Sequence, residues 1–127
     1  MTTDNPSSEK KAIRVDIVSD VVCPWCVIGF KQIEHALSAK ELEAEYHWHP
    51  FELNPHMLPG GQDLGEHITE KYGTTPEADA DTRARLSQMG QALGFTFRYY
   101  DEMRIYNTFG AHQLLHWAGE NLSLIHI

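Results

Sequence analysis

The stretch that most constrains the fold of this chain is "SDVVCPWCVIGF", residues 19–30, because the spacing of apolar residues changes there. Before it, apolar side chains recur at every second position from Ile13 to Ile17, which predicts a short strand. After it, the apolar positions have the three-to-four spacing of a helix running to about Lys40: Cys26, Phe30, Ile33 and Leu37. Pro24 suits the first turn of that helix, where its missing N–H costs nothing.

A second strand is expected over residues 45–53, "EYHWHPFEL". Its side chains alternate between an apolar face and a histidine face, namely Tyr46 and Trp48 against His47 and His49. A strand, a helix and a strand within about forty residues form a βαβ unit, which is parallel and right-handed by default. We therefore assign residues 12–53 to such a unit.

Residues 54–120 are interpreted as an inserted helical region. Three helices are expected in it: Leu64 to Tyr72, Pro76 to a stop at Gly94 with Thr75 as its cap, and a last helix that Thr108 caps and that runs through Ala118. An aromatic connector joins the last two. The acidic run at residues 77–83 is expected to be solvated. Residues 121–127, "NLSLIHI", carry no helix-stop signal and are interpreted as a non-native tail.

Charge and composition exclude several classes of function. Eighteen acidic and ten basic side chains give a formal charge of −8, which argues against nucleic acid as a partner. No apolar run reaches the length of a membrane span. Residues 1–11 form a polar leader that we expect to be disordered, without the apolar core of a secretory signal. We therefore expect a cytoplasmic protein, in which a CxxC pair is more often catalytic or metal-binding than structural.

The two cysteines of the CPWC motif should differ in reactivity. Cys23 would stand at the N-terminus of the helix, where backbone N–H groups and the helix dipole favour a thiolate. Cys26 lies on the apolar stripe and should be buried and protonated. A dithiol redox catalyst needs this asymmetry, because one thiol attacks and the other resolves the mixed disulfide.

Two other interpretations of the cysteines stay open on the residues alone. A zinc site needs four ligands, and the chain has no third cysteine, although an HxH pair on the second strand could bind a metal together with His56. The two cysteines could also be buried without a function. We predict no metal site, and we expect the histidines to form a polar sheet face.

Four segments in order carry a resemblance to a known family: "DVVCPWCVIGFKQIEHAL", "HPFELNP", "KYG" and "NTFGAHQLLHWA". Together they resemble the FrnE-type branch of the DsbA-like thioredoxin-fold oxidoreductases. That branch neighbours the 2-hydroxychromene-2-carboxylate isomerases and the kappa-class glutathione transferases. The resemblance runs from about Val15 to Ala118.

The resemblance implies an α/β fold, in which the N-terminal βαβ unit of a thioredoxin fold is followed by part of an inserted helical domain. It makes Cys23 the nucleophile and Cys26 the resolving thiol, with Pro24 and Trp25 at the start of the active-site helix. Trp25 cannot hydrogen-bond to a thiolate as a histidine there could, so we expect a weaker oxidant. The resemblance also implies six residues of a substrate groove: Phe51, Asn54, Pro55, Asn107, Thr108 and His112. Each of these six could instead have a purely structural role.

The chain departs from the family after the helical region. Family members continue into another strand, a cis-proline loop facing the cysteines, a hairpin and a last helix, whereas the last proline here is Pro76. We therefore expect the C-terminal half of the fold to be missing, and the apolar faces of the two strands to be poorly covered. The uncovered strand edge could also pair two copies as a homodimer.

The sequence thus predicts a thiol–disulfide oxidoreductase, acting as oxidase, reductase or isomerase through Cys23 and Cys26. Its partner would be a protein or small molecule that carries a disulfide or a dithiol. No bound cofactor is expected, and glutathione is a candidate thiol partner. The alternatives are a glutathione-dependent isomerase or transferase of the related branch, which needs no resolving cysteine, and an inactive fragment.

Overall fold

Two parallel strands and the helix between them hold the CPWC motif. The computed structural model describes residues 12–121, and the predicted leader and all but Asn121 of the predicted tail lie outside this range. The βαβ unit consists of β1 (Ala12–Ser19), α1 (Pro24–Ala39) and β2 (Glu43–Pro50). The elements that follow are β3 (Gln62–Asp63), α2 (Leu64–Tyr72), α3 (Pro76–Ala92), β4 (Arg104–Ile105) and α4 (Phe109–Asn121).

The sheet of the βαβ unit has the two faces that its alternating residues predict. β1 and β2 pair in parallel, with Val15 opposite Tyr46 and Ile17 opposite Trp48. On this apolar face the Phe30 ring of α1 packs edge-on against both aromatic rings, at centroid distances of 5.2 Å and 5.1 Å. The aromatic contacts thus fix α1 on one face of the sheet.

The other face of the sheet is polar. His49 Nε2 lies 2.8 Å from Asp16 Oδ1, and His47 Nε2 lies 2.6 Å from Glu45 Oε1. Each histidine therefore pairs with a carboxylate on the strands. No residue of β1 or β2 is fully buried on either face.

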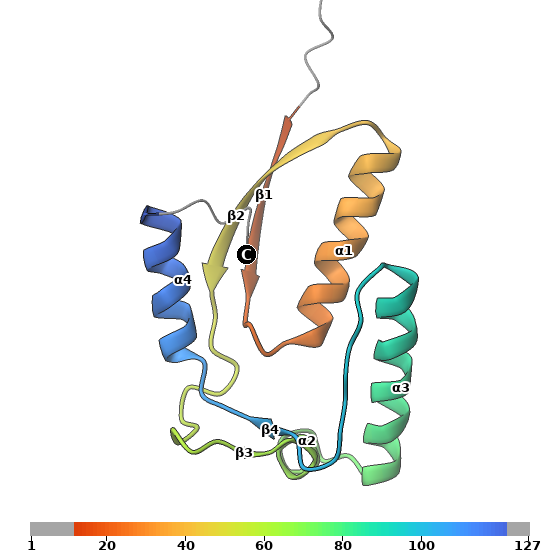
Figure 1. The fold of residues 1–127 in the computed structure, drawn as a ribbon, viewed down its shortest axis with the longest axis vertical. Coiled ribbons are helices and arrows are strands. Elements are labelled where there is room, and N and C mark those ends of the chain that lie inside the picture. The colour runs from red at the N-terminus through yellow and green to blue at the C-terminus, as the bar shows by residue number, and fades with distance from the viewer. Residues whose placement is uncertain (1–11, 122–127) are drawn as a thin grey trace, which may run out of the picture.

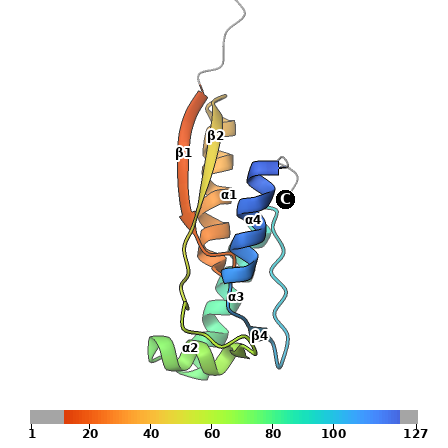
Figure 2. The same ribbon diagram turned by 90° about the vertical axis from the view of Figure 1, so that its left-hand side faces the viewer.

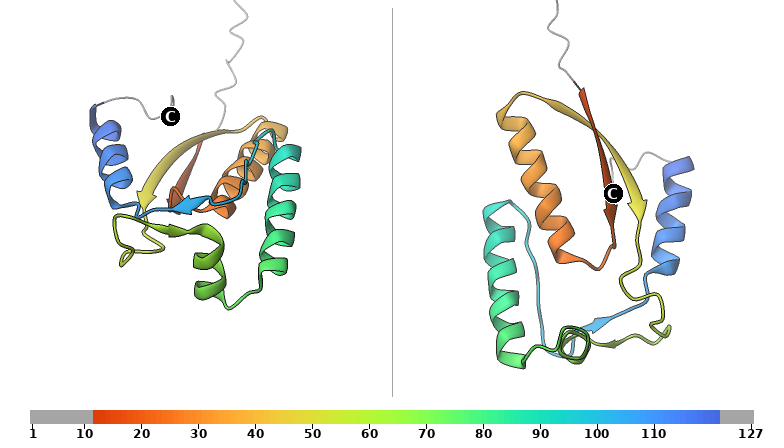
Figure 3. Two further views of the ribbon diagram at one scale, coloured as in Figure 1. Left: turned by 60° about the horizontal axis from the view of Figure 1, so that its bottom comes forward. Right: turned by 180° about the vertical axis from the view of Figure 1, so that it is seen from behind.

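The helical region lies mainly beyond the carboxyl ends of the two strands. α2 and the short β3–β4 pair are found there, α3 lies beside α1, and α4 lies on the β2 side of the sheet (Figures 1 and 3). Figure 2 shows α1 running alongside both strands. None of the helices within residues 12–121 is long and apolar enough to cross a membrane.

The helix boundaries agree closely with the predicted ones, but three expectations were wrong and one strand pairing was not predicted. The second strand ends at Pro50 rather than at residue 53, because its partner β1 ends at Ser19, which pairs with Pro50. The predicted stripe of α1 is only half-buried, and the buried residue of this helix is Ile28. Asp79 in the acidic run is buried and forms a 2.7 Å ion pair with Arg83. The antiparallel pairing of β3 with β4 was not predicted, because each of these strands has only two residues and is too short to show an alternating pattern.

Candidate active site

The CPWC motif begins α1 directly after a tight turn at the carboxyl end of β1. The N–H of Cys23 donates to the carbonyl of Asp20 at 3.0 Å and closes this turn. Cys23 is the N-cap residue of α1, with no hydrogen bond from its side chain to the helix, and Pro24 occupies the first turn. The Cys23 sulfur therefore stands at the positive end of the helix dipole, as predicted.

The two thiols have different surroundings. Both cysteines are free and partly exposed, so Cys26 is less buried than expected. Burial, together with a hydrogen bond with Cys23 and the charge of Cys23, nevertheless raises the pKa of Cys26 to about 11. Cys26 is therefore a thiol at neutral pH, and its proton is available to a thiolate at Cys23.

Asp20 is the residue of the site that the sequence analysis missed. Its side chain is only 1 % exposed. One carboxylate oxygen accepts a 2.7 Å hydrogen bond from the N–H of Leu53, in the segment that follows β2. Its backbone N–H donates to Cys26, whereas its negative charge raises the pKa of that cysteine. A carboxylate three residues before the first cysteine was the available signal.

His112 reaches this site from α4. Its Nε2 lies 3.2 Å from Asp20 Oδ1, and its side chain is 10 % exposed. The two residues are 92 positions apart. The structure thus connects the predicted groove residue His112 with the turn before the CPWC motif, through the carboxylate of Asp20.

The other predicted groove residues have structural partners of their own. The amide of Asn107 donates to the carbonyl of Met57 at 2.9 Å, while its oxygen accepts from the N–H of Phe109 at 2.9 Å. Asn54 accepts a 2.6 Å hydrogen bond from Lys71 of α2. These two asparagines fasten the loop after β2 to α4 and to α2.

Thr108 and Phe51 lie next to regular elements. Thr108 is buried directly before α4, and its carbonyl accepts from the N–H of His112 at 3.0 Å. The N–H of Phe51 donates to the carbonyl of Ser19 at 3.0 Å, which continues the pairing beyond β2, and Phe51 is 52 % exposed. Thr108 therefore starts the helix that carries His112, and Phe51 presents an apolar surface.

An open hollow of about 540 Å³ adjoins these loops. Two of the six predicted groove residues, Pro55 and Asn107, contribute to its lining. Its walls come from the loop after β2 and from the start of α4: Glu52, Pro55, Met57, Pro59, Asn107, Phe109 and Gly110. The predicted groove residues thus belong to two facing segments of the chain, and part of their surface is concave.

Trp25, between the two cysteines, faces the helical region with part of its ring. The guanidinium of Arg85 in α3 lies 5.9 Å from the centre of the indole, a cation–π distance. The side chain remains 45 % exposed. It therefore offers an apolar surface beside the thiols while contacting α3.

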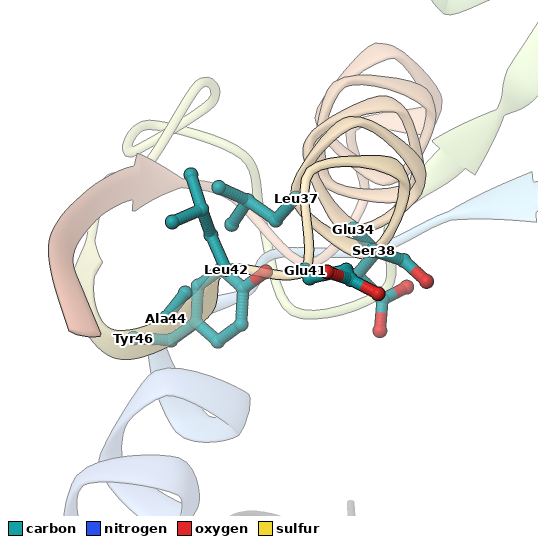
Figure 4. Close-up of a pocket in the computed structure, with 7 residues that line it drawn as sticks. All are labelled: Glu34, Leu37, Ser38, Glu41, Leu42, Ala44 and Tyr46. Atoms are coloured by element: carbon teal, nitrogen blue, oxygen red, sulfur yellow. The ribbon is translucent and has the colours of Figure 1, made fainter. Parts of the chain in front are cut away.

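A second hollow, of about 380 Å³, lies at the other end of α1 (Figure 4). Seven residues line it: Glu34, Leu37, Ser38, Glu41, Leu42, Ala44 and Tyr46. Because α1 has 16 residues and rises about 1.5 Å a residue, this hollow is about 20 Å from the cysteines. It contains neither a cysteine nor a histidine and is not part of the thiol site.

The alternative of a metal centre finds no cluster of ligands. Within residues 12–121 no three His, Cys, Asp or Glu side chains are arranged to hold a metal ion. His47 and His49 contact carboxylates on the sheet instead.

Comparison with known proteins now identifies the family. The profile of the DSBA-like thioredoxin domain matches residues 14–124, nearly the whole chain. The chain belongs to the DsbA-like thioredoxin domain family. The βαβ unit with its motif at the start of α1 is therefore the beginning of a thioredoxin-like fold, and the resemblance seen in the sequence is confirmed at this level. Membership of the FrnE-type branch stays a prediction.

Two relatives show how much of the family's architecture this chain spans. The crystal structure of a probable DsbA oxidoreductase from Streptomyces coelicolor matches with a TM-score of 0.76 and 33% identity, covering 85% of this chain and 47% of that one. An uncharacterized protein of Bacillus subtilis, YwbO, is 40% identical over 47 residues, which are 37% of this chain and 22% of YwbO. The chain thus spans about half of the solved relative and less of the curated one.

Proposed function

We propose that this DsbA-like domain exchanges dithiols and disulfides through Cys23 and Cys26. The observation that carries the proposal is the difference between the two thiols at the start of α1. Cys23 is the helix N-cap, while Cys26 is held as a thiol by burial and by its neighbour. A pair with one attacking and one protonated thiol can form a mixed disulfide and then resolve it.

In the reducing direction, the Cys23 thiolate attacks a substrate disulfide. The substrate S–S bond breaks, one substrate thiolate leaves, and a mixed disulfide forms at Cys23. Cys26 then loses its proton and attacks the Cys23 sulfur, so that the second substrate thiolate leaves and the Cys23–Cys26 disulfide remains. The substrate gains two electrons, the cysteine pair loses two, and the oxidising direction is the reverse.

The surfaces around the thiols favour an extended, partly apolar substrate. Trp25 and Phe51 are each about half exposed, and the hollow beside the loop after β2 is open. We propose that a polypeptide or small molecule with a disulfide or dithiol contacts these surfaces, and that the chain belongs to the FrnE-type branch.

The experiment that tests the proposal is mixed-disulfide trapping with oxidised glutathione. Cys26→Ser should accumulate a stable glutathione adduct at Cys23, detected by mass spectrometry, because nothing resolves it. The unaltered chain should instead end as the internal disulfide. If Cys26→Ser keeps full turnover in a glutathione-dependent transferase assay, the glutathione-dependent alternative is correct. If Cys23 forms no adduct in either chain, the proposal is wrong.

A further inference from the structure

Two arginines of α3 lie over aromatic rings, one in a complete polar cluster and one beside the CPWC motif. The guanidinium of Arg83 is 5.4 Å from the centre of the Tyr99 ring, and its Nη2 atom is 2.7 Å from Asp79 Oδ2. The guanidinium of Arg85 is 5.9 Å from the centre of the Trp25 indole. The same helix thus makes two arginine–aromatic contacts that differ in their acidic partner.

Arg85 also has an acidic residue at the helical spacing, but the two do not pair. Asp81 stands four positions before Arg85, which is a favourable arrangement for an ion pair on a helix. Both residues are exposed, and no ion pair within residues 12–121 includes Arg85. The guanidinium lies against the start of α1. Its charge and its N–H donors are therefore available to a group from outside this part of the chain.

The surroundings of Arg85 suit a carboxylate. A guanidinium is planar, stays charged at all physiological pH values, and binds a carboxylate through two parallel N–H donors. A ring under one face holds the guanidinium in place and leaves its edge to the partner. In the Arg83 cluster this partner is the carboxylate of Asp79. The protein itself thus shows that an arginine of α3 held over a ring pairs with a carboxylate.

We propose that Arg85 selects disulfides that carry a carboxylate near the sulfur attacked by Cys23. The inference rests on the proposed dithiol exchange and names a substrate class for that same site. Trp25 is two positions after Cys23 and is 45 % exposed, so a substrate bound through its sulfur can extend over the indole to the guanidinium. The carboxylate is bound and left unchanged, and the bonds that form and break are those of the exchange itself.

A local cation matters here because the chain as a whole repels anions. With a formal charge of −8, its overall field disfavours a substrate that carries a carboxylate. The removal of one distant positive charge should change this field only slightly. Lys40 offers that control, because it is exposed at the other end of α1, about 20 Å from the cysteines.

The experiment compares two disulfides of the same shape and different charge. 3,3′-Dithiodipropionate carries two carboxylates, and 3,3′-dithiodipropionamide carries two neutral amides in their place. The reduced chain is mixed with an excess of either and quenched with N-ethylmaleimide, and mass spectrometry follows the loss of free thiols. A rate proportional to the disulfide concentration shows that attack by Cys23 is the limiting step. We expect Arg85→Gln to slow the reaction with the dicarboxylate by about tenfold and that with the diamide by about twofold at most.

Lys40→Gln is the matched control and should leave both rates unchanged. Arg85 is exposed, and glutamine is as good a helix former, so Arg85→Gln should fold, which circular dichroism checks. Should it not fold, the unaltered chain decides. Its ratio of dicarboxylate rate to diamide rate must then exceed the ratio measured with dithiothreitol, and an equal or lower ratio overturns the inference.

The carboxylate can belong to a small molecule or to an acidic side chain of a peptide. Two disulfide-linked peptides, with aspartate or asparagine next to the cysteine, repeat the comparison for a polypeptide. A loss in Arg85→Gln with the aspartate peptide assigns the site to acidic peptides. A loss confined to the dicarboxylate assigns it to small molecules.

The outcomes separate this inference from the proposed function. If the unaltered chain loses its thiols with neither disulfide, dithiol exchange itself is wrong. If Arg85→Gln slows the two small disulfides and the two peptides equally, Arg85 acts on the thiols or on the fold, and the selection of carboxylates is overturned. If Arg85→Gln slows none of them, the selection is likewise overturned, while the exchange stands.

Discussion

The two ends of helix α1 are built in different ways. At the N-terminal end, Cys23 makes no side-chain cap, and support comes from Asp20, from the loop after β2 and from α4. At the C-terminal end, the N–H of Glu41 donates to Ser38 and that of Leu42 donates to Leu37, at 3.1 Å and 3.0 Å. This is a Schellman motif made by six consecutive residues.

The difference shows why the chemistry is at one end. At the C-terminal end, the local motif satisfies backbone carbonyls of the last turn, so that these groups are not available to a substrate. The N-terminal end keeps its N–H groups and dipole unshielded by any side-chain cap and depends on contacts between residues up to 92 positions apart. Changes at the cysteine end should therefore alter reactivity and tertiary stability, and changes at the other end should alter only helix stability.

The largest expected effect is loss of exchange in Cys23→Ser. A serine hydroxyl does not ionise near neutral pH, so reduction of a protein disulfide such as that of insulin should fall by about a thousandfold or more. Turbidity of the released chains measures the rate, with dithiothreitol as the final reductant. Glu41→Gly, at the other end of α1, is the matched control and should keep full activity. A Cys23→Ser chain with a tenth of the original rate would contradict the assignment.

The next effect concerns the ionisation of Cys26. With a pKa of about 11 instead of 9.0, its thiolate fraction near pH 8 is up to about 100-fold below that of an ordinary cysteine. Cys23→Ser removes the charge of Cys23 but keeps the burial of Cys26, which is the largest cause of the raised pKa, so alkylation of Cys26 by iodoacetamide in this variant should still be slow and should rise with pH beyond pH 9. The same chain in denaturant should show the ordinary profile. A folded profile with its midpoint at or below pH 9 would contradict the burial of this thiol.

The raised pKa also has a consequence for stability. Between about pH 9 and pH 11 the folded chain holds the Cys26 proton while the unfolded chain has lost it. The contribution of Cys26 to stability is therefore complete below pH 9 and falls as pH rises through this window. Because the pKa values of Tyr46 and Tyr99 are also raised, the slope that belongs to Cys26 is the part that Cys26→Ala removes.

A third prediction compares two aspartates near the same strand. Asp20→Ala leaves the partly buried N–H of Leu53 without its acceptor, so the free energy of unfolding should fall by about 1–3 kcal/mol. Asp16→Ala removes an exposed carboxylate that contacts Arg14 and His49, and should change the free energy of unfolding far less, because solvent screens this pair. Urea unfolding followed by circular dichroism measures both. Equal losses would mean that the Asp20 contacts do not support the turn.

The same contrast explains how much could be predicted from sequence. The Leu64–Tyr72 helix was predicted with its bounds, and the start of α3 at Pro76 with its cap Thr75, because caps and stops are local signals. The change of period at the CPWC motif likewise located β1 and α1. These features depend on residues within a few positions of one another.

The site could be predicted only in part, because its central contact is not local. Cys23, Cys26 and His112 were proposed from the motif and the family resemblance, but nothing in the sequence pairs His112 with Asp20. That pairing depends on where α4 packs, and α4 carries exposed Leu114 and Trp117, so its apolar pattern does not show which side faces the site. The burial of Asp79 was missed for the same reason.

The smallest expected effect tests the C-terminal end of α1. Glu41 has a φ of 53°, a left-handed conformation that costs an ordinary residue about 1 kcal/mol and that glycine adopts freely. Gly94 occupies the same position after α3, with a φ of 77°. Its N–H donates to Gln91 and that of Phe95 donates to Gly90, as in the motif after α1. Glu41→Gly should therefore raise the free energy of unfolding by about 0.5–1 kcal/mol. The gain is smaller than the strain energy that is removed, because glycine loses more conformational entropy on folding.

Gly94→Ala is the opposite change and should lower the free energy of unfolding by about 1 kcal/mol. Urea unfolding measures both, and a loss of stability in Glu41→Gly would mean that the glutamate side chain makes a contribution larger than the backbone strain it brings.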